Sequence, residues 1–478
     1  MLIAAAFLIN SAGNFVLGVL LSAILGPAEF GRYATVALAG LTLAGAVFDW
    51  LRLSTIRFAG DAQRQASFAA SLEAANLAIT LALFAAAGLA FALRLDFGLG
   101  PLLLFLTPLY TVAISRIDYS AAQFRARDLA RPYALIFGLR QLFCFLAAAG
   151  VAWLRRDAAT TVAALAIANL AAAVALGPAL RVPGATLAAA KRQDVWRFFL
   201  YAKPLVASFV LYALISLINR QVALAHLGAA ETGKFALAFD MSQRLFQALY
   251  ALPEIFLFQH ALKLDREQGR AAAEAQLGLN AALALAAFLP VAAGYFALGP
   301  TFEQLIVPQA YRGDFARISL ALAPGLICYG AIVIAVHPVF QLAQRTWPVT
   351  AAALLALVVD AALLIFGGAG ASVEGLAHAY SASLVVAAVA AGAMAFRRKA
   401  VRPSLGDLAV LAAALVAMVA AVRPINALAS PWLAAAAGVS LGGSIYLGIL
   451  LACDFAGSRS FIVARLRARH RLKFGELS

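Results

Sequence analysis

The chain consists of long apolar stretches separated by short polar ones. A helix needs about 20 apolar residues to cross the hydrocarbon layer of a bilayer, which is about 30 Å thick. By this criterion we predict fourteen membrane-spanning helices. Their expected spans are residues 3–24, 33–53, 75–93, 99–115, 133–154, 158–180, 199–219, 235–258, 276–298, 318–341, 347–368, 373–396, 404–422 and 431–452.

The apolar stretches are predicted to be helices and not the strands of a membrane barrel. They are rich in Ala, Leu and Gly and lack the alternation of polar and apolar positions that barrel strands show. The first stretch is too long for the apolar region of a signal peptide, so we expect it to be retained. Hydrophobic residues make up 64% of the 478 positions and charged residues 12%, with a mean hydropathy of +0.90. We therefore predict an all-α, polytopic membrane protein.

The distribution of basic residues indicates how the chain is oriented. Most of the 37 Lys and Arg residues fall in alternate connecting segments, which places both termini in the cytoplasm. The net charge of +15 is accounted for by these segments and by a basic C-terminal tail near anionic lipid headgroups. The bilayer is the expected partner of this charge, and we expect no binding to nucleic acid.

The sequence LGAAETGKFA, at residues 227–236, is similar to the phosphate-binding loop of nucleotide hydrolases. Such a loop follows a strand and needs Ser or Thr after its Lys to hold magnesium. Here Phe235 follows Lys234, and a membrane span precedes the loop. We therefore expect no ATP site and no cofactor.

The same sequence occurs earlier in the chain, as LGPAEFGRYA at residues 25–34, with six of ten positions identical. The copies follow the first and seventh spans, so they face the same side of the membrane. This pattern is typical of a parallel duplication of two six-helix bundles, with the glycines forming turns. The predicted domains are a bundle at 1–181, a cytoplasmic amphipathic linker at 182–198, a second bundle at 199–400, an additional helix pair at 401–456 and a basic tail at 457–478.

The sequence contains no motif that indicates catalysis or metal binding. HExxH, GxSxG and clusters of His or Cys at metal-ligand spacing are all missing. Cys144, Cys328 and Cys453 occur singly in separate spans, which predicts neither a disulfide nor a metal site. The loops on the outer side are too short for the chemistry of a polysaccharide polymerase or ligase. An enzyme of that type is therefore the less favoured alternative, and we do not expect catalytic residues.

Charged residues within or at the ends of the spans are candidates for function, because a charge in hydrocarbon is costly and usually faces a polar cavity or a partner. These residues are Asp49, Arg52, Arg140, Arg220, Asp240, Arg244 and Asp360. Asp49 and Arg52 are spaced to form an ion pair on one helix face, as are Asp240 and Arg244. Arg140 has no acidic residue within one turn, so it needs a distant partner, a cavity or an anionic ligand.

Several of these arginines suit a cavity that binds a large polar anion. A guanidinium group can donate two parallel hydrogen bonds to phosphate or diphosphate. Arginines outnumber the carboxylates of Asp49, Asp240 and Asp360, which favours an anionic over a cationic substrate. The arginines expected to line the cavity are Arg52, Arg140, Arg220 and Arg244.

Three segments resemble the oligosaccharide flippases of bacterial polysaccharide export. They are INSAGNFVLGVLLSAILGPAEFGRYA, FDWLRLSTIRFAG at residues 48–60, and YAKPLVASFVLYALISLINRQVALAHLGAAETGKFALA. That family belongs to a superfamily that includes multidrug exporters of the MATE type and lipid II flippases. The resemblance implies two six-helix bundles in a V, often with two additional helices. It also implies transfer of undecaprenyl-diphosphate-linked oligosaccharides across the bacterial inner membrane.

The resemblance extends to individual basic positions. Arg52, Arg57 and Arg220 match positions that are basic in the family, and Asn219 stands where the family often has Asp before the last of these arginines. The implied partners are the lipid-linked oligosaccharide, a polysaccharide polymerase and the export machinery.

Two transport hypotheses follow. The favoured one is a flippase that works by alternating access, with the diphosphate head in a cationic cavity and the lipid tail in the bilayer. The alternative is a cation-coupled exporter of drugs or metabolites, in which Asp49, Asp240 or Asp360 matters more than any arginine. Transport of a charged head group can be driven by an ion gradient or by removal of the product on the outer side, and the sequence does not decide between them.

Overall fold

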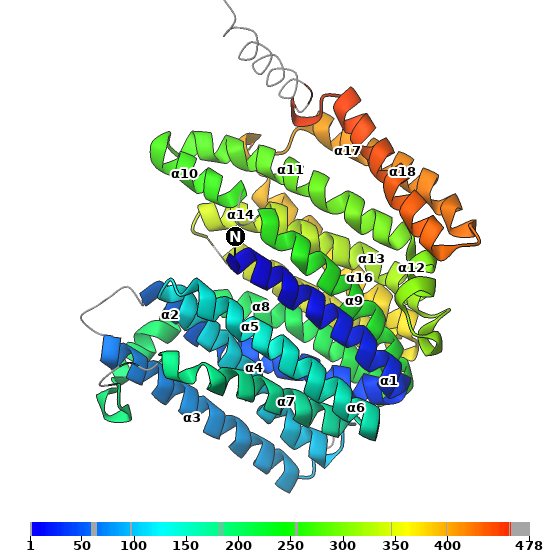
Figure 1. Ribbon diagram of the computed structural model, residues 1–478. Helices are drawn as coiled ribbons and strands as arrows, with labels where there is room; N and C mark the ends of the chain where they lie inside the picture. Colours follow the sequence, from blue (N-terminus) through cyan, green and yellow to red (C-terminus); the bar gives the residue numbers. More distant parts are fainter. Residues whose placement is uncertain are drawn as a thin grey trace, which may run out of the picture. The chain divides into compact units, whose positions relative to one another are not determined.

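The computed structural model of the chain is all-α (Figure 1). It contains no β-strand in the residues that it describes, and twelve of its helices are long and apolar enough to cross a membrane. The predicted all-α membrane fold is therefore confirmed. The residues described are 2–58, 65–95, 98–180, 182, 185–253, 257–345, 347–397, 399–457 and 459.

The predicted count of fourteen spans is not confirmed, for two physical reasons. The first two predicted spans lie in one helical segment, α1 (Leu2–Val47), which consists of two helices that meet at the non-helical residue Gly26, so both belong to one of the twelve segments. Gly26 has φ 70° and ψ 173°, a conformation that glycine adopts without steric cost. In addition, α9 (Ala229–Pro253) contains four charged residues and is not among the twelve apolar helices.

Two helix boundaries differ from the predicted ones in ways that affect the site. The span predicted at 33–53 ends at Val47, and a separate short helix, α2 (Asp49–Phe58), begins there. The span predicted at 99–115 corresponds to α4 (Pro101–Ala126), which continues well beyond its predicted end. This extension places Arg116 and Asp118 in a membrane helix.

The chain divides into two compact units, of which the first comprises Met1–Arg244, Pro308–Ile318 and Val349–Ser383. Within it, α4 packs against α7, and α1 packs against α4, α5 and α8. A π-helical turn at Phe145–Ala149 joins α5 to α6. Its other helices are α3 (Gln65–Ala92), α5 (Ala130–Cys144), α6 (Gly150–Arg155), α7 (Ala158–Ala175), α8 (Arg192–His226), the first part of α9, and parts of α15 (Trp347–Phe366) and α16 (Val373–Ala395).

An aromatic core joins α2, α3 and the beginning of α8. Phe198 is buried, and its ring centroid lies 5.3 Å from that of Phe58 and 5.1 Å from that of Phe68. The Ser54 hydroxyl donates a hydrogen bond to the Phe198 carbonyl at 3.2 Å. Residues 192–198, the last part of the predicted linker, are therefore the first turns of α8. The other predicted domain limits stay predictions, and the basic tail lies outside the described residues apart from 457 and 459.

The second unit comprises Leu245–Val307, Ser319–Pro348 and Leu384–Ser478. A π-helical turn at Ile332–Val336 joins α13 to α14. The helices of this unit are the remainder of α9 and of α16, α10 (Gln259–Glu267), α11 (Arg270–Ala297), α12 (Gly299–Ile306), most of α13 (Phe315–Ala331), α14 (His337–Leu342), α17 (Leu405–Val422) and α18 (Pro431–Ala452).

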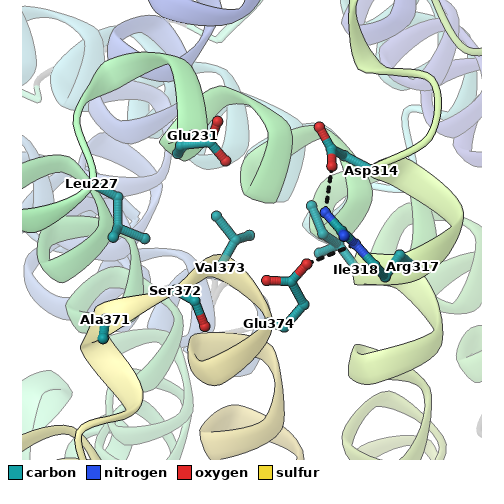
Figure 2. A pocket seen from close by; sticks show the side chains of 9 residues that line it. All are labelled: Leu227, Glu231, Asp314, Arg317, Ile318, Ala371, Ser372, Val373 and Glu374. Carbon is teal, nitrogen blue, oxygen red and sulfur yellow. Dashed lines mark hydrogen bonds and ion pairs between the residues drawn. The ribbon is translucent and has the colours of Figure 1, made fainter.

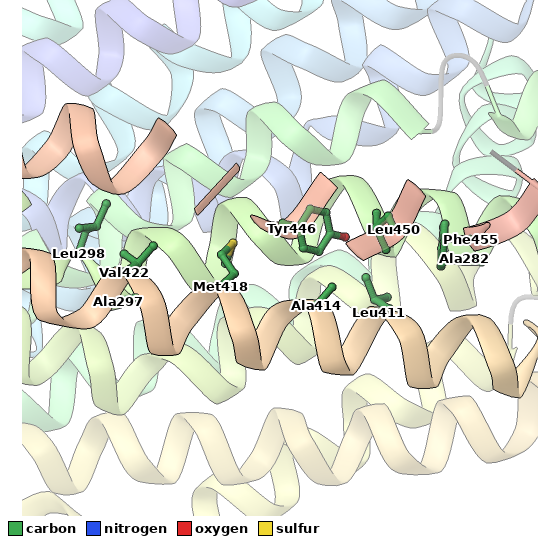
Figure 3. Close-up of a cluster of buried hydrophobic side chains, with 10 residues drawn as sticks. All are labelled: Ala282, Ala297, Leu298, Leu411, Ala414, Met418, Val422, Tyr446, Leu450 and Phe455. Atoms are coloured by element: carbon green, nitrogen blue, oxygen red, sulfur yellow. The ribbon is translucent and has the colours of Figure 1, made fainter. Parts of the chain in front are cut away.

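The helix pair predicted to be additional, α17 and α18, packs against α11 (Figure 3). The Tyr446 hydroxyl donates a hydrogen bond to the Ala286 carbonyl at 2.7 Å. Gly442 lies so close to Val422 that an added Cβ would be 2.8 Å from the Val422 side chain. The contact contains a cluster of buried apolar side chains, which are those of Ala282, Ala297, Leu298, Leu411, Ala414, Met418, Val422, Tyr446, Leu450 and Phe455.

The two copies of the repeated sequence pack directly against each other within the first unit. A Cβ added to Gly31 would lie 2.7 Å from the backbone nitrogen of Gly233. A Cβ added to Gly233 would overlap the backbone of Pro27. Each copy also has a glycine with positive φ, Gly26 at 70° and Gly228 at 87°. The copies are therefore helix starts that cross at glycines, and their sequence is explained by close packing.

We expect Gly31→Ala and Gly233→Ala each to destabilise the protein by at least about 1–3 kcal/mol, the usual cost of overpacking. The added methyl group would overlap backbone atoms, which cannot rotate away as a side chain does. Thermal unfolding in detergent measures the effect. Gly88→Ala in α3 is the matched control, because no atom lies within 4 Å of its Cβ position. Unchanged unfolding temperatures for both crossing glycines would contradict this contact.

Candidate anion-binding site

Arg140 is a half-buried arginine of a membrane helix in the first unit. Its Nε donates a hydrogen bond to Asn169 Oδ1 at 2.9 Å. The Asn169 amide in turn donates to the Leu165 carbonyl at 2.7 Å and to the Cys144 sulfur at 3.6 Å. Arg140 forms no ion pair with any residue that the structure describes. The side-chain hydrogen bond of Arg140 therefore goes to a neutral amide and not to a carboxylate.

Arg244, on α9, is a second half-buried arginine of this kind. Its Nη1 donates a hydrogen bond to the backbone carbonyl of Asn14 on α1. A Cβ added to Gly18 would lie 2.9 Å from the same nitrogen, so the glycine leaves room for the guanidinium. The local ion pair between Asp240 and Arg244 is not found, because Asp240 binds Arg220 on α8. Within the described ranges, Arg244 has no carboxylate partner.

Arg52 differs because it carries its own counter-ion. Its Nε and Nη2 both donate to the Asp49 carboxylate, the second at 3.0 Å. The two residues lie three apart on α2, and their side chains are 40% and 23% exposed. The ion pair expected from this spacing therefore forms, and it leaves Arg52 partly accessible.

Asp118 and Tyr110, both on α4, connect these three arginines. Asp118 interacts electrostatically with Arg140 and Arg52. The buried Tyr110 side chain lies within electrostatic range of Arg140 and Arg244. Asp118 is exposed although it lies in an apolar helix, and a carboxylate in that position is stable only next to water or a cation. Sequence reasoning missed Asp118 because the predicted span stopped at residue 115.

The arrangement is cationic and contains hydrogen-bond donors on several helices. The site contains three guanidinium groups, those of Arg52, Arg140 and Arg244, and only two carboxylates, those of Asp49 and Asp118. Two of the guanidiniums lack a carboxylate within hydrogen-bond reach among the described residues. Such groups can donate paired hydrogen bonds to a phosphate or diphosphate. The chemistry that the site supports is anion binding.

Arg220 has a different environment from these arginines. Its side chain is 1% exposed, and its Nη1 donates to the Ala34 carbonyl at 2.8 Å. Its Nη2 donates to the Asp240 carboxylate, and its guanidinium lies 5.7 Å from the ring centroid of Phe239. Both terminal nitrogens are therefore occupied by α1 and α9. This geometry indicates that Arg220 stabilises the packing of α8 against α1 and α9 and does not bind a substrate.

Asp360, on α15, is fully buried and pairs with Asn219 and not with an arginine. The Asn219 amide donates to Asp360 Oδ2 at 2.8 Å and to the Ile215 carbonyl at 2.9 Å. Within the described part of the chain, Asp360 Oδ1 and Asn219 Oδ1 have no hydrogen-bond partner. A buried carboxylate with one unsatisfied oxygen can take up a proton or a small cation. Asp360 therefore stays a candidate for ion coupling.

Arg57 does not join the other candidate residues. It is exposed in the last turn of α2, and its guanidinium lies 5.9 Å from the ring centroid of Phe58.

A chain of ion pairs lies at the beginnings of α9, α13 and α16, in the first unit (Figure 2). Lys234 binds Glu231 at 2.7 Å and Asp314 at 2.9 Å, and Arg317 binds Asp314 at 2.6 Å and Glu374 at 2.7 Å. The hydrogen bonds to Glu231 and Asp314 raise the pKa of Lys234 above its ordinary value. The stability that Lys234 gains from these two hydrogen bonds is therefore lost only as the pH rises through its raised pKa.

The pocket beside this chain has a volume of about 240 Å³ and is lined by Glu231, Asp314 and Glu374 together with Arg317. Carboxylates outnumber guanidinium groups in it, so it is poorly suited to a phosphate. Among the described residues, no group of three or more His, Cys, Asp or Glu side chains is placed to hold a metal ion. Cys144, Cys328 and Cys453 are free thiols.

Comparison with known proteins shows similarity in structure only. No family model and no curated protein matches the sequence. Among solved structures, the chain is similar to the lipid II flippase MurJ in an inward closed conformation, with a TM-score of 0.76 and 14% identity. That match covers 96% of this chain and 99% of MurJ.

The chain is also similar to an inward-facing multidrug resistance MATE family transporter of the MOP superfamily. The TM-score is 0.52 and the identity 14%, over 81% of this chain and 93% of that one. At such low identity, the likenesses show the fold and not the substrate. The chain has the fold that these membrane transporters share.

Proposed function

We propose that this protein is a flippase that moves an undecaprenyl-diphosphate-linked oligosaccharide across the bacterial inner membrane for polysaccharide export. The observation that carries the proposal is that Arg140 and Arg244 lie half-buried in the helical bundle without a carboxylate partner among the described residues. A cationic drug would be repelled by such groups, whereas a diphosphate would neutralise them. MurJ, whose fold the chain shares, is a lipid II flippase, so a lipid-linked cargo is compatible with this fold.

In this proposal the arginines bind the diphosphate and the glycan, while the lipid tail stays in the bilayer. Arg140 and Arg244 supply unpaired positive charge, and Arg52 can exchange part of its bond with Asp49 for a substrate oxygen. The head group enters from the cytoplasm, the bundles move by alternating access, and the head group leaves on the other side.

The proposed setting is the inner membrane with both termini in the cytoplasm, and the proposed protein partners are a polysaccharide polymerase and the export machinery. The transporter fold supports a protein that is not an enzyme. Two cargoes in proteoliposomes test the proposal against its rival. The flippase requires movement of an undecaprenyl-diphosphate oligosaccharide and none of a lipophilic cationic dye. Dye efflux without glycolipid movement would instead favour the drug exporter.

We expect Asp360→Asn to remove the dependence of transport on an ion gradient while glycolipid binding is retained. Asn has nearly the same shape as Asp and can still accept the bond from Asn219, but it does not bind a proton or a cation. The measurement is glycolipid movement in proteoliposomes with and without an imposed proton or sodium gradient. Ser383→Ala, at another buried position of the same unit, is the control. An unaltered response of Asp360→Asn to the gradient would rule out this role.

A further inference from the structure

A second pocket in the first unit lies where α4 ends and α5 begins. Its volume is about 380 Å³, and its walls include Ile56 of α2, Arg125, Asp128, Leu129 and Tyr133. A cavity needs only about 10–15 Å³ of such volume to hold one water molecule. The pocket is therefore large enough for a polar group together with its substituents.

The pocket has an unpaired positive charge. Arg125 lines it, is exposed, and has no ion pair or side-chain hydrogen bond to the residues that the structure describes. The carboxylate of Asp128 also lines the pocket. The lining thus contains one charged group of each sign, and the backbone donors of the neighbouring helix start favour an anion.

The first turn of α5 provides backbone donors at the same place. Its N-cap position is held by Leu129, whose side chain gives no capping hydrogen bond. The backbone nitrogens of Ala130 and Tyr133 are bonded to Asp128 and Leu129 carbonyls at 3.1 Å, and Pro132 has no N–H. The Arg131 N–H is left for another acceptor. An uncapped helix start beside a free guanidinium is a favourable site for a phosphate oxygen.

Two exposed apolar side chains, those of Leu129 and Ile56, line the pocket. Leu129 is 37% exposed and Ile56 is 41% exposed. At the start of α8, which packs against α2, Trp196 is 60% exposed and its ring stacks on that of Phe199. Exposed tryptophan and basic residues together are typical of the level of lipid headgroups. The ligand of this pocket therefore has both a charged and an apolar part.

We propose that this pocket binds the phosphate group of an anionic membrane lipid. Arg125 and the start of α5 hold the phosphate oxygens, and Ile56 and Leu129 contact the glycerol and the upper acyl chains. Its arginine, Arg125, is not one of the arginines of the candidate transport site, although the lining residue Tyr133 lies within electrostatic range of Arg52. The lipid proposal does not rest on the flippase proposal. Its ligand is a component of the bilayer and not the cargo.

The test is equilibrium binding of phosphatidylglycerol to the full-length protein in phosphatidylcholine nanodiscs, measured by native mass spectrometry. Arg125→Gln is expected to weaken binding about tenfold or more, the usual effect of losing a charge-assisted hydrogen bond. Arg131→Gln is a second variant, and an unfolding curve verifies that each is folded. Arg155→Gln is the matched control, because Arg155 is also exposed but lies at the end of α6, whereas the pocket lies at the beginning of α5.

Inorganic phosphate, added as a competitor, distinguishes the two sources of the anion. If inorganic phosphate displaces phosphatidylglycerol from the wild type but has no such effect on Arg125→Gln, the site recognises the phosphate group alone. Binding of the lipid without such displacement supports a site that also needs the glycerol and acyl chains. The proposal is overturned if Arg125→Gln and Arg131→Gln, both folded, bind phosphatidylglycerol as tightly as the Arg155→Gln control.

Discussion

Replacement of Arg220 by alanine is expected to destabilise the protein by roughly 3–5 kcal/mol, the usual cost of breaking a buried ion pair. The side chain is 1% exposed and joins α8 to the Ala34 carbonyl of α1 and to Asp240 of α9. Its removal leaves a carboxylate and a carbonyl without their donor in an apolar surrounding. The expected results are a low yield of folded protein and a large fall in the unfolding temperature.

A double variant separates this structural role from a role in substrate binding. Arg220→Met with Asp240→Leu removes both charges and keeps similar side-chain volumes, so most of the lost stability is expected to return. Arg32→Ala is the control, because its bond to Glu29 is an exposed ion pair, with Arg32 47% exposed, and such pairs contribute at most about 1 kcal/mol. Wild-type stability of Arg220→Ala would show that the ion pair does not hold these helices.

Arg140→Gln and Arg244→Gln are each expected to weaken binding of undecaprenyl diphosphate by roughly 10- to 100-fold, as expected for loss of a hydrogen bond to a charged group. Both variants should keep or raise the unfolding temperature, because each removes a half-buried charge that has no carboxylate partner among the described residues. Binding to the purified protein in detergent gives the affinity, and thermal unfolding gives the stability.

Arg345→Gln is the control for this pair of variants, because Arg345 is exposed and lies in the second unit. Its affinity for undecaprenyl diphosphate should equal that of the wild type. The contrast with Arg220→Ala is the essential point: loss of affinity at constant stability identifies a binding residue, whereas loss of both identifies a structural one. Equal affinities for Arg140→Gln, Arg244→Gln and Arg345→Gln would exclude the two arginines from the site.

The fold class could be predicted because apolar length alone determines it. The number of spans was harder to predict, because two helices meet at a single glycine, Gly26, and because α9 contains four charged residues. The repeated sequence was readable from ten residues. That Gly31 and Gly233 meet each other was not, because spacing along a chain says nothing about which helix starts cross.

The sequence identified which charged residues are candidates for the site, but it did not show which of them pair with each other. Spacing predicted correctly that Arg52 and Asp49 pair on one helix, but it suggested a local partner for Asp240, which instead binds Arg220 from another helix. Contacts between helices depend on packing, which a periodic pattern does not encode. Asp118 was missed for a simpler reason, since the polar end of α4 resembled a loop.

The central claim is that unpaired arginines of the first unit carry a lipid-linked diphosphate across the membrane. The most direct test is the rate at which an undecaprenyl-diphosphate oligosaccharide changes leaflet in proteoliposomes, for the wild type and for Arg140→Gln. We predict rapid movement with the wild-type protein and a rate close to that of protein-free vesicles with the variant. Movement that is equally fast with both proteins, or that is no faster with the wild type than without protein, would contradict the account.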